Sequence, residues 1–126
     1  RRKTQDLLER ADRVMDRKAD LAVSIHMNSV PSSRWSGAQT FFYSRNPESI
    51  RLAQAIQAEI RESLGNTSRE ANGADTVYLL RTLPMPTALV EVGFLSHPEE
   101  ARRLADPDYQ IKVAAAIYRG ILRYNS

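Results

Sequence analysis

The chain has 126 residues, the size of one domain, and its 42% hydrophobic and 26% charged residues predict a folded core rather than a disordered chain. The net charge of +3 favours an anionic partner but is too small for the dense basic surface of a nucleic-acid-binding domain. The absence of cysteine excludes disulfides, thiol nucleophiles and cysteine-ligated zinc, and no run approaches the ~20 apolar residues of a membrane span.

The first part of the chain predicts a helix, a buried strand and a loop. Apolar residues at helical spacing predict an amphipathic helix over residues 4–18. The short run Leu21–Ile25 has the length and β-branched content of a buried strand, with His26 at its carboxyl end. The segment Met27–Gly37 is rich in Asn, Ser, Pro and Gly, which indicates a loop.

A second strand and the longest helix are predicted next. Aromatic residues in the run Thr40–Tyr43 indicate a strand. Asn46 and Pro47 form a helix start, and the apolar spacing that follows predicts a helix that continues to Gly65. The polar segment Asn66–Asp75 predicts a loop of the kind that often borders a site.

The last third predicts two strands and two helices. We expect the strands at Val77–Leu80 and Ala88–Val92, separated by prolines. Ser96 and Glu99 match a capping box for a short helix that ends near Leu104. A final helix is predicted from the Asp106–Pro107 start to about Leu122. Because strands and helices alternate incompletely, this order predicts an α/β fold with a mixed sheet.

His26 and Glu91 are the two residues whose placement points to chemistry. An imidazole at a strand's carboxyl end can ligate a metal or transfer a proton, and it can equally be a structural histidine satisfied by hydrogen bonds. Glu91 interrupts the apolar run Ala88–Val92, where a carboxylate is costly unless it is paired, faces a metal or lies at an exposed edge. Together the two suit metal-assisted hydrolysis, in which a carboxylate takes and returns a proton.

The residues alone supply only part of such a site. Catalytic zinc needs three protein ligands, and the chain holds one other histidine, His97, which lies in a helix cap. Weaker candidates for substrate contacts are Asn28 after the first strand, the loop pair Arg34 and Trp35, and Arg81. Trp35 can equally anchor its own loop, and Arg81 can equally form a surface salt bridge.

Two segments of the sequence resemble the zinc-dependent N-acetylmuramoyl-L-alanine amidases of type 3, in the family's order. These segments are Ala19–Ser29 (ADLAVSIHMNS) and Ala88–His97 (ALVEVGFLSH), and Gly37–Tyr43 and Tyr78–Arg81 resemble the family's intervening segments, with Gln39 in place of a Glu. The segments Ser32–Thr40 and Ser63–Thr67 are similar to the germination-specific branch, which acts on spore cortex.

The resemblance implies a phosphorylase/hydrolase-like α/β fold, with a three-layer, mixed twisted sheet flanked by helices. It implies that His26 is one zinc ligand and Glu91 the catalytic carboxylate. The family's two other ligands precede the point where this chain starts, as do its first strands and helix. We therefore expect residues 1–126 to be a single partial catalytic domain that lacks a complete zinc site. His97 is not assigned as a ligand.

The implied reaction is hydrolysis of the amide between N-acetylmuramic acid and the L-alanine of the peptidoglycan stem peptide. The expected cofactor is Zn²⁺, the expected partner is peptidoglycan, and the expected location is extracytoplasmic, in the cell wall or the cortex space. The alternative is a non-catalytic peptidoglycan-binding module that uses basic loops and Trp35. Nucleic-acid binding is disfavoured because aromatic residues are not interleaved with Lys and Arg on one predicted face.

Overall fold

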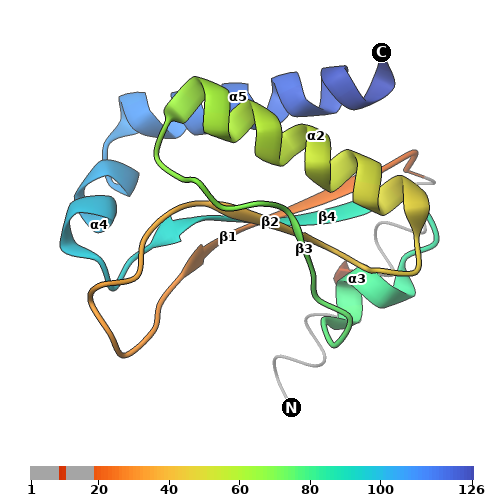
Figure 1. Cartoon of the computed structure of the whole chain (residues 1–126), viewed down its shortest axis with the longest axis horizontal. Helices are drawn as coiled ribbons and strands as arrows, with labels where there is room; N and C mark the ends of the chain where they lie inside the picture. The colour runs from red at the N-terminus through yellow and green to blue at the C-terminus, as the bar shows by residue number, and fades with distance from the viewer. Residues whose placement is uncertain (1–8, 11–18) are drawn as a thin grey trace.

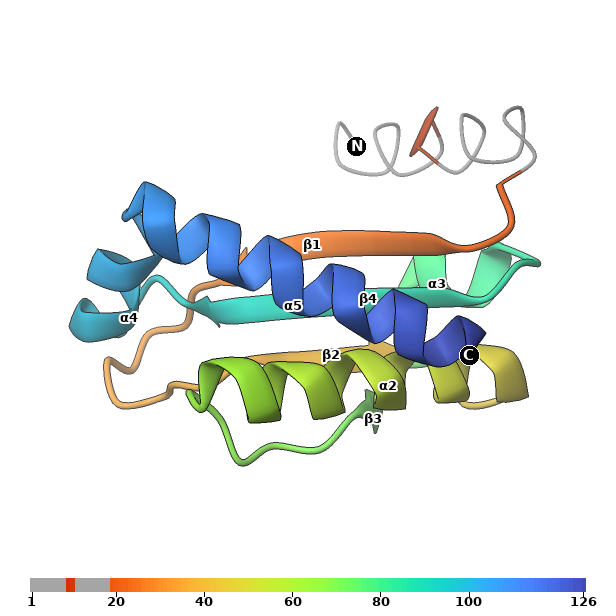
Figure 2. The same cartoon turned by 90° about the horizontal axis from the view of Figure 1, so that it is seen from above.

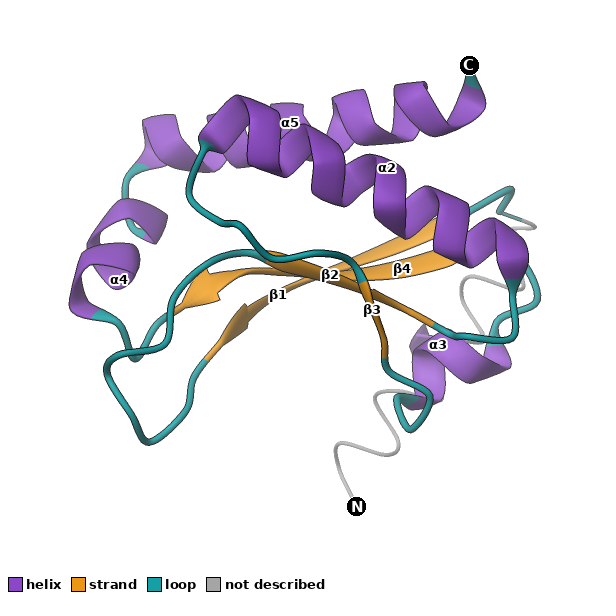
Figure 3. Cartoon of the chain, viewed as in Figure 1, coloured by secondary structure: helices purple, strands orange, loops and turns teal. Residues whose placement is uncertain are grey.

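The computed structural model describes residues 9–10 and 19–126 (Figure 1). The helix expected over residues 4–18 falls almost entirely outside these described residues. Helices and strands alternate incompletely along the chain, because β1 is followed by β2 and α4 by α5 (Figure 3). Their bounds are β1 Ala22–Asn28, β2 Gln39–Phe42, α2 Pro47–Leu64, β3 Asn72–Gly73, α3 Tyr78–Thr82, β4 Thr87–Phe94, α4 Pro98–Leu104 and α5 Pro107–Asn125.

The strands form one four-stranded mixed sheet in the order β1-β4-β2-β3. β4 pairs with β1 in parallel and with β2 antiparallel, and β2 pairs with β3 in parallel. Helices α2 and α5 cover one face of the sheet, whereas α3 lies on the other (Figures 1 and 2). The predicted α/β fold, with a mixed sheet flanked by helices, is therefore confirmed.

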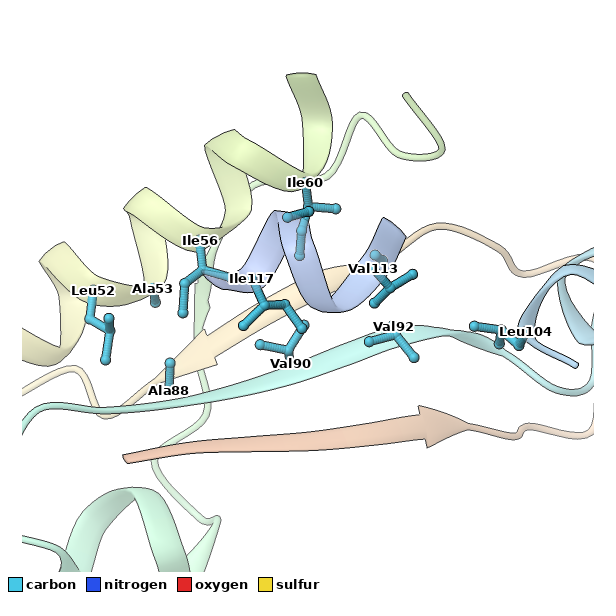
Figure 4. Packing of buried hydrophobic residues seen from close by; sticks show 12 residues of the cluster. Leu52, Ala53, Ile56, Ile60, Ala88, Val90, Val92, Leu104, Val113 and Ile117 are labelled. Carbon is cyan, nitrogen blue, oxygen red and sulfur yellow. The ribbon is translucent and has the colours of Figure 1, made fainter. Parts of the chain in front are cut away.

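The main core lies between the sheet and the pair α2 and α5. Alternate residues of β4 point toward these two helices (Figure 4). Apolar side chains of both helices, spaced by three or four residues, pack against them. The face of the sheet that α2 and α5 cover is therefore occupied by the hydrophobic core. The buried residues are Ala38, Leu52, Ala53, Ile56, Ile60, Ala88, Val90, Val92, Leu104, Val113, Ala116 and Ile117.

Two local signals placed α2 correctly. The Asn46 side chain accepts hydrogen bonds from the backbone N–H groups of Glu48 and Ser49, so it caps the helix ahead of Pro47. Gly65 ends the helix with a φ of 62°, in the left-handed region that glycine adopts most easily. The predicted helix from Pro47 to Gly65 is confirmed.

One predicted strand is wrong. Residues 78–82 form the short helix α3 instead of a strand over Val77–Leu80. Leu79 and Leu80 are both buried, and a run of a few apolar residues fits a buried helix turn as well as a strand. The preceding segment, predicted to be loop throughout, contributes the short strand β3 at Asn72–Gly73.

The predicted capping box at Ser96 is also wrong. His97 caps α4, because its Nδ1 accepts a hydrogen bond from the N–H of Glu100 at 3.3 Å. Pro98 is the first helical residue, which makes the residue before it the cap. Ser96 instead accepts a hydrogen bond from the N–H of Val30 at 3.2 Å and so holds the loop after β1. None of the helices in the described part is long and apolar enough to cross a membrane.

Candidate active site

His26 and Glu91 lie next to each other on one face of the sheet. In the parallel pairing of β1 and β4 these two residues are register partners. Partners in adjacent strands project to the same face, so their side chains are neighbours. Val90 and Val92, on either side of Glu91, point toward α2 and α5 (Figure 4), which leaves Glu91 on the opposite face. The two residues singled out in the sequence are brought together.

A third polar residue continues this row. Gln39 of β2 is the antiparallel partner of Glu91, so Glu91 stands between an imidazole on one side and an amide on the other. The Gln39 Nε2 group donates to the backbone oxygen of Glu70 at 2.8 Å, which fixes the amide. Sequence reasoning noted Gln39 only as a departure from the family pattern, because strand register is invisible in a single sequence.

Glu91 is an unsatisfied, half-buried carboxyl group. Its Oε2 atom is buried and has no hydrogen-bond partner among the described residues. Burial raises the pKa of Glu91 above its ordinary value, and the nearby His26 opposes that rise. A carboxyl group whose pKa is moved toward neutrality is suited to accept and return a proton.

His26 is half-buried and held by one side-chain contact. Its Nε2 lies 2.7 Å from Ser24 Oγ, and Ser24 precedes it by two residues on the same face of β1. β1 extends through Asn28, three residues beyond its predicted end, so His26 lies within the strand instead of at its terminus. A strand holds the ring more rigidly against Glu91 than a loop would.

The described residues do not form a complete metal site. They contain no group of three His, Cys, Asp or Glu side chains placed to hold a metal ion. Catalytic zinc takes three protein ligands, and His26 supplies one imidazole. The unpartnered Oε2 of Glu91 beside it is compatible with a metal and its bound water nearby, because a buried carboxylate needs a partner.

A small pocket of about 200 Å³ opens beside Glu91. Its walls are mostly apolar, and Glu91 and Asn28 are its polar residues. This composition suits a small apolar group held next to the carboxylate. Of the predicted substrate-contact residues, Asn28 thus lines the same pocket as Glu91. The other lining residues are Phe41, Ala74, Val77 and Leu89.

The loop after β1 presents Trp35 and Arg34 to solvent. Trp35 is 46% exposed, and the guanidinium carbon of Arg34 lies 5.0 Å from the centre of its ring. The end of this loop is attached to α4, because the N–H of Gly37 donates a hydrogen bond to Glu100 Oε2 at 3.0 Å. Trp35 is therefore available for contact and does not anchor the loop in the core.

Arg81 lies on α3 and not at a strand end. Its side chain is exposed, and its guanidinium carbon lies 5.9 Å from the centre of the Tyr78 ring. In the described part of the chain, Arg81 has no carboxylate within salt-bridge distance. The alternative that it forms a surface salt bridge is therefore not supported there.

Sequence comparison matches a family and several known proteins. A family model described as N-acetylmuramoyl-L-alanine amidase matches residues 1–123. The chain is 48% identical over 124 residues to the germination-specific N-acetylmuramoyl-L-alanine amidase of Bacillus subtilis, covering 98% of this chain and 52% of that protein. It is 33% identical to the N-acetylmuramoyl-L-alanine amidase LytC of the same species, covering 94% of this chain and 24% of that protein.

Solved structures match the fold closely. The CwlD amidase of Clostridioides difficile, solved in complex with the GerS lipoprotein, has a TM-score of 0.93 at 36% identity, covering 97% of this chain and 62% of that chain. The catalytic domain of CwlV from Bacillus (Paenibacillus) polymyxa has a TM-score of 0.86 at 33% identity, covering 94% and 65%. The chain thus spans about half the length of the germination-specific relative and under two thirds of the CwlD chain.

Proposed function

This chain belongs to the N-acetylmuramoyl-L-alanine amidase family, and from that premise we propose that the protein hydrolyses the amide bond between N-acetylmuramic acid and L-alanine in peptidoglycan. One observation in the structure supports this proposal most. Glu91, whose pKa is raised by burial and whose Oε2 has no hydrogen-bond partner among the described residues, lies beside His26 on the face of the sheet opposite α2 and α5. A lone structural carboxylate would be satisfied by its neighbours.

In the proposed reaction Glu91 acts first as general base and then as general acid. Its carboxylate accepts a proton from water as the water oxygen attacks the lactyl carbonyl carbon. The same carboxyl then gives the proton to the alanine nitrogen as the carbon–nitrogen bond breaks. The products are the lactyl carboxylic acid of the sugar and a stem peptide with a free α-amino group. The pocket beside Glu91 would hold a small apolar group of the substrate.

The proposed cofactor is zinc, with His26 as one ligand. With zinc bound, this site would gain Lewis-acid polarisation of the carbonyl and a more acidic water. The remaining ligands would come from outside the described residues, which contain no group of three side chains placed to hold a metal ion. We therefore expect zinc-dependent activity only where residues other than the described ones complete the metal site.

The proposed setting is extracytoplasmic, in the cell wall or spore cortex. The germination-specific relative and the cell wall amidases among the other relatives support this setting. The exposed pair Arg34 and Trp35 also favours a second function, a module that holds peptidoglycan without cleaving it. These two functions differ in whether a covalent bond is broken.

The experiment is product identification. The intact protein is incubated with purified peptidoglycan, with zinc or with a chelator, and the soluble products are analysed by mass spectrometry. The proposal predicts stem peptides with free L-alanine amino groups, released only when zinc is present. Binding to peptidoglycan without any such release would support the non-catalytic module.

A further inference from the structure

Arg69 reaches from the segment between α2 and β3 to the same end of the sheet as Glu91. Its guanidinium carbon lies 5.5 Å from the centre of the Phe94 ring. Phe94 pairs with Asn28 beyond a β-bulge that shifts the register after His26, and Asn28 lines the pocket beside Glu91. The Arg69 Nη1 atom lies 3.5 Å from Gln39 Oε1, the residue paired with Glu91. Arg69 therefore borders the candidate active site.

The backbone of Arg69 is fixed by hydrogen bonds to the side chains of Gln57 and Thr67. Gln57, which is almost fully buried on α2, donates through Nε2 to the backbone oxygens of Arg69 at 2.9 Å and Ala38 at 3.1 Å. Thr67 accepts a hydrogen bond from the N–H of Arg69 at 3.0 Å and donates to Ala38 at 2.8 Å. The segment is thus tied to both α2 and β2, which places the arginine before any ligand arrives.

Arg69 is partly buried, and its guanidinium has no acidic partner in the part of the chain that the structure describes. No carboxylate of the described residues lies within salt-bridge distance of Arg69. Glu100 binds nearby backbone N–H groups, and its ion-pair partner is Arg103 at 4.0 Å. Arg69 Nε donates to the backbone oxygen of Ser36 at 3.1 Å, whereas the contact to Gln39 is long for a hydrogen bond.

We propose that Arg69 binds a carboxylate of the stem peptide; this inference rests on the function proposed above. A guanidinium presents donors in a plane that matches a carboxylate, and charge-assisted hydrogen bonds of this kind are the strong ones. The carboxyl of the lactyl group is consumed in the scissile amide, so a free carboxylate comes from the peptide side. Arg69 then orients the substrate with its leaving peptide toward Phe94.

The same contacts would also let Arg69 serve only as an anchor for the Ser36 loop. A pair of substrates separates these roles. Both contain N-acetylmuramoyl-L-alanine followed by a D-glutamyl residue, and they differ in whether the α-carboxyl of that residue is a free carboxylate or a carboxamide. An anchor supports both substrates equally, whereas a carboxylate-binding residue distinguishes them.

The test compares the intact wild-type protein with Arg69→Gln on both substrates. Arg61→Gln is the matched control, because Arg61 pairs with exposed Glu70 at 2.7 Å and lies outside the site. We expect Arg69→Gln to lower kcat/KM for the carboxylate substrate about 10- to 100-fold, the range for a hydrogen bond to a charged group. The carboxamide substrate should change no more than it does with Arg61→Gln. Equal losses for both substrates would overturn the inference.

A binding measurement keeps this test separate from the proposed function. Calorimetry with Glu91→Gln measures the affinity for both compounds without turnover. The inference is supported if Glu91→Gln binds the carboxylate compound more tightly and the double variant Glu91→Gln with Arg69→Gln loses this preference. This conclusion holds even if the wild-type protein cleaves neither compound. The lack of cleavage would contradict the hydrolytic function alone. Equal affinity for the two compounds would refute the role of Arg69.

Discussion

The His26 imidazole and the Glu91 carboxylate are neighbours across the parallel pairing of β1 and β4, on the face of the sheet that α2 and α5 leave uncovered. The two residues lie far apart in sequence and meet because β4 inserts between β1 and β2. A rigid sheet therefore positions both groups. Their separation does not depend on a loop conformation.

The raised pKa of Glu91 predicts how stability depends on pH. Between the unfolded pKa, near 4.5, and the higher folded pKa, the folded state binds more protons than the unfolded state. Stability contributed by this group is therefore present at low pH and is lost as pH rises through that window. The neutral variant Glu91→Gln should be more stable than wild type near neutral pH, and this advantage should shrink below pH 4.5.

Urea unfolding of the metal-free intact protein and the variant at several pH values measures this difference. Groups common to both proteins cancel in the comparison, so the remaining pH dependence belongs to Glu91. A stability difference that stays constant across the pH range would contradict the raised pKa.

The proposed role of His26 as a zinc ligand predicts that its replacement removes zinc from the protein. His26→Ala should remove most bound zinc from the intact protein, as measured by elemental analysis. Ser24→Ala removes the group that contacts His26 Nε2, and we expect about a 10- to 100-fold loss of zinc affinity. The control is His97→Asn, which keeps a residue able to cap α4 and should retain full zinc content. Full zinc content in His26→Ala would rule out His26 as a ligand.

The exposed ring of Trp35 predicts a contribution to peptidoglycan binding. Trp35→Ala, made in protein that carries Glu91→Gln to prevent turnover, should weaken binding by about 0.5–1.5 kcal/mol. Trp35→Phe keeps an aromatic face and should retain most of the affinity. Co-sedimentation with insoluble peptidoglycan gives the comparison. Unchanged binding by the alanine variant would show that the ring makes no contact.

The close approach of α2 and α5 predicts the effect of a single methyl group. A Cβ atom added at Gly120 would lie 2.6 Å from Ile56 Cα, closer than packed atoms tolerate. Gly120→Ala should therefore destabilise the intact protein by about 1–3 kcal/mol in urea unfolding. Helix propensity alone predicts the opposite sign, a gain of about 1 kcal/mol. A stabilised variant would thus contradict the packing between the helices.

Elements with a clear period or cap could be predicted from the sequence. The helix that begins at Pro47 carries both end signals and a long apolar face, so its bounds agree closely with α2. The segment at Val77–Leu80 offers a few apolar residues without a period, and only tertiary packing decides that it is helical. The choice between Ser96 and His97 as the cap of α4 depends on where the helix begins. Because Pro98 is its first residue, the cap is His97.

The candidate site was predictable only in part, for a related reason. His26 and Glu91 stand out because each is a polar residue in an apolar run, which is visible in one sequence. Gln39 joins them through strand register, and Arg69 through a loop tied down by Gln57. Those relationships depend on contacts between distant segments, so the local sequence around Gln39 and Arg69 contains no signal for them.

The most direct test of hydrolysis by Glu91 compares turnover with binding in Glu91→Gln. The variant keeps the size of the side chain and removes its ability to accept and return a proton. Release of stem peptide by the zinc-loaded intact protein should fall at least 100-fold, about the smallest contribution expected of acid–base catalysis, with peptidoglycan binding and zinc content retained. Turnover close to that of the wild-type protein, with binding and zinc unchanged, would contradict the account.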